Sequence, residues 1–284
     1  MIIRHDLKLV FLHVPKCAGK ELRDVLLTGA PHGACESLFN FAYSNRLHRY
    51  VDLAHLPMAD LIHWPQFKYL SKYTVVASIR NPEERLTSAA NEFYRQRSQE
   101  EEVLVNRSGL PSPWLHDYLA QLPQRHSQLD PRFIHSLPIT WFTHLGCEPM
   151  VDHLLRCELL ADQIQDLAKD LGWPDEIKSL AAKKLRNSPI RTTSLDPCIW
   201  MLSQRLYRQD FNTFNYTPSP QGVESAGLTA PKSSRWAERP LSQLEPSEST
   251  SHDADLLSWA ESVKWHWGPR CERQEPIRLA PTRK

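Results

Sequence analysis

An apolar run that changes abruptly into a short basic loop limits what this chain can fold into. The run is KLVFLHV at residues 8–14, and PKCAGK at residues 15–20 follows it directly. Unbroken apolar runs of this length are typical of parallel strands buried on both faces of a sheet. Residues 20–27 then carry apolar side chains at helical spacing. The pattern predicts a strand, a lysine-containing loop and a helix, with the loop and the helix N-terminus suited to hold an anion.

Further strand and helix signals alternate along the chain. YTVVASIR at residues 73–80 is a second β-branched run, and it stops at an N-cap and proline pair at residues 81–82. This pair predicts a helix that continues to about Arg97. Residues 152–160 predict a third strand, and the pair at 196–197 repeats the helix-start signal. The alternation predicts an α/β fold with a mostly parallel central sheet flanked by helices.

The last part of the chain has a different composition. Residues 217–251 contain eight serines and five prolines but few large apolar side chains, so they bury too little surface to fold on their own. Residues 254–267 have the spacing of a short Trp-containing amphipathic helix. We therefore expect a folded domain at residues 1–216 and a Ser/Pro-rich, low-complexity tail at residues 217–284.

Size, charge and cysteine pattern narrow the protein class. The 284 residues suffice for a large α/β domain, and the net charge of +1 gives no indication of nucleic-acid binding. No apolar run approaches the roughly 18 residues of a membrane span. The first residues lack the pattern of a secretory signal. The six cysteines form no C-x-x-C pair, which disfavours zinc and indicates reduced thiols. We expect a cytoplasmic protein.

The basic loop differs from a nucleotide-triphosphate P-loop. The P-loop pattern G-x-x-x-x-G-K-[ST] matches at Gly19 and Lys20, but Val14 replaces the first glycine and Glu21 replaces the hydroxyl that binds magnesium. The loop keeps two lysines and a helix N-terminus, which suit a smaller anionic group. An ordinary strand-to-helix turn with exposed lysines is the alternative interpretation.

Two segments resemble sulfotransferases that use 3′-phosphoadenylyl sulfate (PAPS), in the group that includes many bacterial and carbohydrate sulfotransferases. HVPKCAGKEL resembles the family's 5′-phosphosulfate loop, and VVASIRNPEERLTSAANEFYR at residues 75–95 resembles its 3′-phosphate segment. Weaker matches follow in family order at residues 52–61, 154–163, 185–191 and 206–216. The resemblance implies a P-loop-nucleotide-hydrolase-like fold and transfer of a sulfuryl group from PAPS to a hydroxylated small molecule or glycan. Adenosine 3′,5′-bisphosphate would be the product, and no metal would be required.

The resemblance also implies roles for particular residues. Lys16 would neutralise charge on the leaving phosphate, as this chemistry requires. Arg80 and Ser88 would bind the 3′-phosphate, although an ion pair of Arg80 with Glu83 or Glu84 is the structural alternative. The implied cofactor contacts are Pro15, Lys16, Cys17, Ala18, Gly19, Lys20, Glu21, Arg80, Ser88, Asn187 and Ser188. Lys20 and Glu21 replace the hydroxyl residues usual in the family.

The acceptor hydroxyl also needs a general base. His55 is preferred, because it lies between the two cofactor motifs, where the family often has a histidine. His13 is the second choice and is expected to be a packed neighbour of the site. The other candidates are Glu21, Asp52 and His63.

The acceptor pocket is expected within residues 98–150. This stretch holds histidines and the aromatic residues Trp114, Phe133, Trp141 and Phe142, which suit a sugar but also an ordinary core. The sequence indicates neither the acceptor nor the oligomeric state. Two other functions stay open. One is a P-loop-type nucleotide kinase, and the other is a non-catalytic nucleotide-binding relative that would lack His55 or Lys16.

Overall fold

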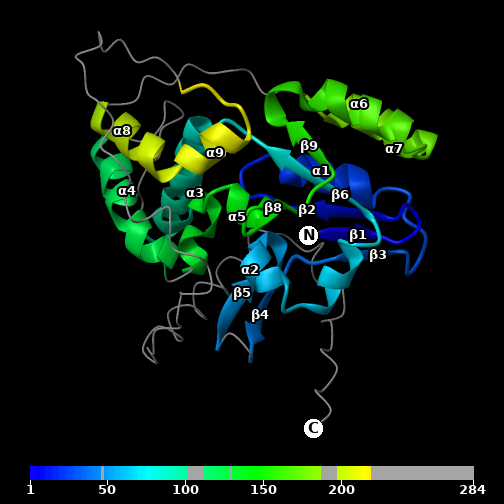
Figure 1. Cartoon of the computed structure of the whole chain (residues 1–284), viewed down its shortest axis with the longest axis horizontal. Helices are drawn as coiled ribbons and strands as arrows, with labels where there is room; N and C mark the ends of the chain where they lie inside the picture. Colours follow the sequence, from blue (N-terminus) through cyan, green and yellow to red (C-terminus); the bar gives the residue numbers. More distant parts are fainter. Residues whose placement is uncertain (46–47, 102–111, 128–129, 187–196, 219–284) are drawn as a thin grey trace.

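A five-stranded sheet in the order β3-β1-β2-β6-β9 forms the centre of the protein (Figure 1). The computed structural model describes residues 1–45, 48–101, 112–127, 130–186 and 197–218. The parallel strands are β2 (Leu9–Leu12), β6 (Thr74–Ile79) and β9 (His153–Arg156). β1 (Ile2–Arg4) runs antiparallel to both β2 and β3 (Cys35–Ser37). The sheet is therefore mixed, with a parallel half that carries the two strongest sequence motifs.

Two of the three predicted strands are confirmed, and the third is partly wrong. The apolar runs at residues 8–14 and 73–80 form β2 and β6, and all four side chains of β2 are buried. The run at 152–160 leaves the sheet after Arg156, where the turn η4 (Cys157–Leu159) leads into helix α6 (Leu160–Asp170). A short apolar run has the same appearance at a strand end and at a helix start, so periodicity cannot place this boundary.

Helices cover one face of the sheet. These are α1 (Gly19–Leu27), α6 and α7 (Asp175–Lys184), and their apolar stripes pack on side chains of β2 and β6. Leu22 and Leu26 from α1 and Ile164 from α6 share a cluster with Phe11 and Val76. The helical spacing after the basic loop thus forms the expected amphipathic helix.

Short elements cover the opposite face. They belong to a cluster that contains Ile3, Val10 and Ala77 of the sheet. The elements are the hairpin β4 (Phe41–Ser44) and β5 (Arg49–Asp52), the turn η1 (Leu53–His55), α2 (Met58–Leu61), the turn η2 (Pro65–Tyr69), α5 (Thr140–Thr143) and β7 (His144–Leu145). β7 pairs with β8 (Glu148–Pro149), whose two residues are exposed. These connections bring the chain between β5 and β6 against the end of β2.

A third cluster lies in the helices beyond the carboxyl end of β6 (Figure 1). It is built around Phe93, Tyr118 and Phe133. The elements are α3 (Pro82–Glu101), α4 (Ser112–Ser127), the turn η3 (Pro131–Ser136), α8 (Pro197–Leu206) and α9 (Arg208–Thr213). The predicted start of α3 is confirmed, because Oδ1 of Asn81 accepts from the N–H of Glu83 at 2.9 Å. The helix ends at Glu101 rather than near Arg97.

The rest of the sequence interpretation meets the structure only in part. Helix α8 begins at Pro197, as the proline signal predicts. Within the described ranges, no helix is long and apolar enough to cross a membrane. The predicted tail beyond residue 218, with its Trp-containing segment at 254–267, lies outside the described residues.

Candidate functional site

The two strongest motifs lie at the same edge of the sheet. The basic loop leaves the carboxyl end of β2, and Arg80 follows the carboxyl end of β6. The two strands are adjacent and parallel, with Leu12 opposite Ala77. In α/β proteins the carboxyl edge of parallel strands is where ligands bind. The topology therefore brings together segments that lie about sixty residues apart in the chain.

The basic loop has an unusual backbone. Lys16 has φ 63° and Ala18 has φ 56°, so two residues with a side chain occupy the left-handed region. Ala18 caps α1 without a side-chain hydrogen bond, and the first N–H groups of a helix have no acceptor within it. The Ser78 hydroxyl on β6 donates to the Cys17 carbonyl and ties the loop to the neighbouring strand. Strain of this kind is common at ligand-binding loops.

Gly19 is needed for a close approach rather than for its backbone freedom. A Cβ at this position would lie 1.8 Å from Nε2 of His13. The imidazole of His13 therefore packs directly on the start of α1. Any larger residue at position 19 would displace the ring.

Three histidine rings from distant parts of the chain meet beside this loop. His55 ends the turn η1, and its ring centroid lies 4.3 Å from that of His13 and 5.2 Å from that of His135. Nδ1 of His55 lies 3.0 Å from the carbonyl oxygen of His13. Because a carbonyl oxygen only accepts, Nδ1 carries the proton and Nε2 is the basic nitrogen of the neutral ring. This is the tautomer that a general base requires.

The environment keeps this cluster neutral. Burial lowers the pKa of His55, although the Asp52 carboxylate and the bond to His13 act in the opposite direction. Burial also holds the pKa values of His13 and His135 well below the usual range, and the neighbouring His55 adds to both effects. Asp52 accepts from the N–H of Ala54 at 2.9 Å and so caps the turn that presents His55. Asp52 therefore both holds this turn and opposes the lowering of the pKa of His55.

His135 is a site residue that sequence reasoning did not single out. The motif arginine Arg85 is fully buried and donates to the carbonyl of His135 at 2.9 Å and to that of Leu137. Arg85 thus fixes the turn η3, which carries His135 toward His55. No local pattern marks a histidine in a short turn, so only the fold reveals this neighbour.

Lys16 contacts an acidic residue of helix α3. Its Nζ lies 3.3 Å from Oε2 of Glu92, and the two side chains are 23% and 17% exposed. Arg95 binds the same carboxylate, with Nη2 at 2.5 Å from Oε1 and Nε at 3.2 Å from Oε2. Burial alone would raise the pKa of Glu92, but the cationic neighbours Lys16 and Arg95 prevail and lower it to about 2. Glu92 is therefore ionised at any physiological pH.

Arg80 forms the ion pair that was the structural alternative to a phosphate contact. Its Nη2 lies 2.8 Å from Oε2 of Glu84, four residues further on. Glu83 instead accepts from the side chain of Gln204 at 2.7 Å. Ser88 is half-buried one turn beyond Glu84 on the same helix. The Arg80 guanidinium is thus paired with a carboxylate, which a phosphate at this position would have to replace.

The comparison with known families now bears on this site. The sequence pattern of the Sulfotransferase family matches residues 1–217. The chain belongs to the sulfotransferase family. No curated protein and no solved structure matches it. Family membership makes the chain a transferase of sulfuryl groups, and the match covers the whole strand–loop–helix body.

The remaining predicted loop residues of this sulfotransferase differ in exposure. Pro15 and Cys17 are buried, whereas Lys20 and Glu21 are exposed. A hydrogen bond with Cys17 and burial hold the pKa of Cys157 well above its usual range. These two thiols are packed core groups. Lys20 and Glu21 would meet a cofactor chiefly through the backbone of the first helical turn.

Other sequence candidates lie outside the site or outside the described residues. His63 lies just beyond the end of α2, near Asp60. Burial raises the pKa of the Asp60 carboxyl, although Arg49 and His63 act in the opposite direction. Phe133 and Phe142 are buried in two apolar clusters, so the alternative of an ordinary core describes their packing. Trp141 is half-buried and packs against the cluster that contains Ile3, Val10 and Ala77. Asn187, Ser188 and the side chain of Trp114 lie outside the described part of the chain.

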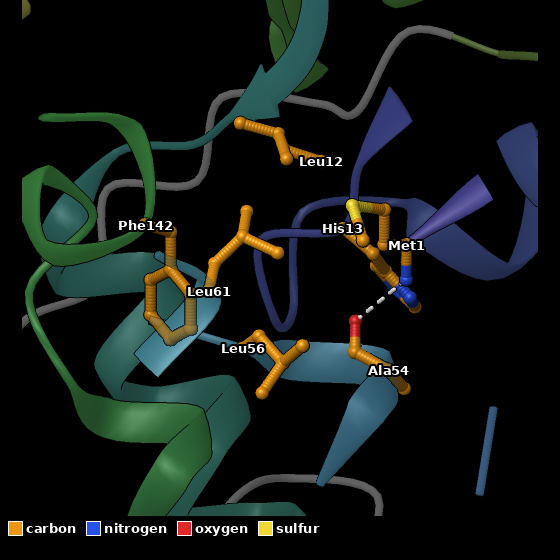
Figure 2. Close-up of a pocket in the computed structure, with 7 residues that line it drawn as sticks. All are labelled: Met1, Leu12, His13, Ala54, Leu56, Leu61 and Phe142. Atoms are coloured by element: carbon orange, nitrogen blue, oxygen red, sulfur yellow. Dashed lines mark hydrogen bonds between the residues drawn. The ribbon is translucent and has the colours of Figure 1, made fainter. Parts of the chain in front are cut away.

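A narrow cavity lies behind the histidine cluster. Most of the side chains around it are apolar, as Figure 2 shows; the lining residues are Met1, Leu12, His13, Ala54, Leu56, Leu61 and Phe142. The Met1 amine donates to the carbonyl of Ala54 at 3.0 Å. The cavity is a packing gap beside the site. Among the described residues, no three His, Cys, Asp or Glu side chains are grouped to hold a metal ion.

Proposed function

We propose that this sulfotransferase moves a sulfuryl group from PAPS to a hydroxyl of a carbohydrate or another hydroxylated acceptor. The observation that carries the proposal is the meeting of the basic loop, Arg80 and His55 at one edge of the sheet. The loop holds Lys16 in a left-handed conformation, and Lys16 is close enough to His55 to lower its pKa. A donor-side cation and a neutral base thus lie next to each other.

The donor would bind as it does in a P-loop-like phosphate site. The N–H groups at the start of α1 and the Lys16 ammonium would contact the 5′-phosphosulfate. Arg80 and Ser88 would contact the 3′-phosphate, with Arg80 exchanging Glu84 for the phosphate. Asn187 and Ser188 stay proposed nucleotide contacts on the strength of the family resemblance.

The proposed reaction is an in-line transfer. The acceptor oxygen attacks the sulfur as Nε2 of His55 takes the hydroxyl proton. The bond between sulfur and the bridging phosphate oxygen breaks, and its electron pair leaves with adenosine 3′,5′-bisphosphate. Lys16 stabilises the negative charge that grows on this phosphate. Positioning of both partners supplies most of the remaining acceleration.

Two other functions would require different residues. A P-loop-type nucleotide kinase needs the first glycine and the magnesium hydroxyl, but this chain has Val14 and the exposed Glu21 there. A non-catalytic nucleotide-binding relative would have no reason to keep Lys16 and His55 together in one site. The arrangement therefore favours sulfuryl transfer.

A binding titration tests the donor assignment. The purified protein should bind adenosine 3′,5′-bisphosphate without magnesium and should bind ATP–magnesium more weakly. Arg80→Ala should weaken bisphosphate binding by roughly ten- to hundredfold, the value of a hydrogen bond to a charged group. Lys178→Ala removes a positive charge from α7 and serves as the matched control. Equal affinity of Arg80→Ala and the parent would show that the 3′-phosphate assignment is wrong.

A second experiment separates the roles of His55 and Lys16. His55→Asn retains an amide donor for the His13 carbonyl but has no basic nitrogen. It should lower turnover by roughly 10²–10⁴-fold and leave bisphosphate affinity nearly intact. Lys16→Ala should damage both properties, because Lys16 serves the leaving phosphate. If His55→Asn keeps full transferase activity on an accepted hydroxyl compound, the base is another residue.

A further inference from the structure

The ion pair between Lys16 and Glu92 has no place in the proposed reaction as described so far. Glu92 lies on α3, the helix that follows Arg80, and its Oε2 is 3.3 Å from Nζ of Lys16. Its carboxylate is only 17% exposed. An anion is therefore held at the very cation that the proposed donor needs. The Lys16 ammonium cannot form its closest ion pair with the donor and with Glu92 at the same time.

The second partner of Glu92 makes an exchange feasible. Arg95 holds Oε1 at 2.5 Å and Oε2 at 3.2 Å, and its own side chain is 56% exposed. When Lys16 turns toward a bound anion, Glu92 keeps these two contacts. The carboxylate is then still satisfied and need not be buried unpaired, which would be costly. Arg95 thus lowers the cost of releasing Lys16.

We infer that Glu92 is a positioning residue that competes with the sulfuryl donor for Lys16, and that Arg95 shifts this competition toward the donor. The inference rests on the proposed function and deepens it. Without donor, Glu92 holds the ammonium at the loop and compensates its charge beside the histidine cluster. With donor bound, the ammonium moves to the 5′-phosphosulfate and Glu92 keeps its contacts with Arg95.

The competition predicts opposite effects for two neighbouring residues. Glu92→Gln removes the competing anion, so bisphosphate should bind about two- to fivefold more tightly, the range expected of a partly exposed ion pair. Arg95→Gln leaves Glu92 with Lys16 as its main cation, so binding should weaken by up to about twofold. The double variant should bind bisphosphate about as tightly as Glu92→Gln, because the pair with Glu92 is the contact through which Arg95 affects Lys16. General damage to α3 would instead weaken binding in all three variants.

A readout without nucleotide tests the ion pair by itself. The rate at which an acylating reagent labels Lys16 can be measured by mass spectrometry of peptides from the folded protein. Labelling should speed up in Glu92→Gln, slow down in Arg95→Gln and be blocked by bisphosphate in the parent. Asp24→Asn makes the same charge change on α1, where the partner is Lys184 at 3.4 Å, and should alter neither labelling nor affinity.

The two readouts separate failure of the inference from failure of the proposed function. If the parent binds bisphosphate but Glu92→Gln binds it no more tightly, the competition does not exist, while the proposed function stands. If labelling of Lys16 is the same in Glu92→Gln and the parent, Glu92 does not hold Lys16. If neither the parent nor any variant binds bisphosphate, the proposed function is wrong, and so is the inferred competition that depends on it. Labelling alone then decides whether the ion pair holds Lys16.

Discussion

The chemistry of His55 depends on one hydrogen bond and on its burial. The His13 carbonyl fixes the proton on Nδ1, so that Nε2 has the lone pair. Burial lowers the pKa of the ring, so the basic form persists to a lower pH than in a free histidine. A ring with this tautomer and this pKa is ready to accept a proton at neutral pH.

The pH dependence of the reaction should reflect this lowered pKa. A general base works only when it is neutral, so kcat/KM should fall as the pH drops through the pKa of His55. Because that pKa lies below the ordinary value of about 6.5, the rate at pH 6.5 should already exceed half of its plateau value. The acid limb should disappear in His55→Asn and persist in His116→Gln, a change on the exposed side of α4. A limb centred above pH 6.5 would contradict this assignment.

Helices α5 and α9 are joined through one buried carboxylate. Asp210 on α9 is fully buried and accepts from the N–H of Ile139 at 2.7 Å. It also accepts from the N–H and the hydroxyl of Thr140, both at 3.0 Å. Burial raises the pKa of Asp210, and these hydrogen bonds oppose that rise. The carboxylate thus supplies acceptors for the start of α5, which no residue of α5 itself provides.

Replacing this carboxylate should destabilise the whole body. Asp210→Asn exchanges one acceptor oxygen for an amide donor, so at least one buried N–H loses its partner. We expect the free energy of unfolding to fall by about 1.5–3 kcal/mol, as for other hydrogen bonds to charged groups. Urea denaturation measures this, with Asp166→Asn on the exposed face of α6 as control. A loss no larger than that of the control would mean that the cap contributes little.

At the scale of the whole molecule, the division into a body and a tail after residue 216 stays a prediction. Residues 1–217 carry the Sulfotransferase family pattern, and the three apolar clusters found among the described residues lie within that range. The last described contacts include Tyr216, whose hydroxyl donates to Glu158 at 2.9 Å. Residues 217–251, with eight serines and five prolines, offer little apolar surface to bury.

Truncation after Thr217 should therefore leave the body stable. We expect the melting temperature of the truncated protein to stay within about 2 °C of that of the full chain, because little apolar surface is removed. Bisphosphate affinity should be unchanged as well. Thermal unfolding of both forms, followed by circular dichroism, provides the comparison. A much lower melting temperature would show that the segment around Trp259 packs on the body.

Most of the local structure follows from local patterns. The sequence predicted the strands β2 and β6, the basic loop and the starts of α1, α3 and α8. The signals used, which are the spacing of apolar residues, N-cap residues and proline, each involve only a few neighbouring positions. The pairing of β2 with β6, which brings Lys16 and Arg80 to one edge of the sheet, is known from the structure. The strands β1 and β3, with three residues each, were missed because so short a run has no measurable period.

The partners within the site were decided by the fold. Glu92 lies 76 positions from Lys16 in the chain, and His135 reaches His55 through a turn held by Arg85. The sequence offered Glu83 and Glu84 equally as partners of Arg80, and helix geometry selected Glu84. The first two contacts join residues that are far apart in the sequence. The third depends on which of two adjacent glutamates points toward Arg80. Their energies arise only when packing brings the groups together and removes water, so no local pattern could have predicted them.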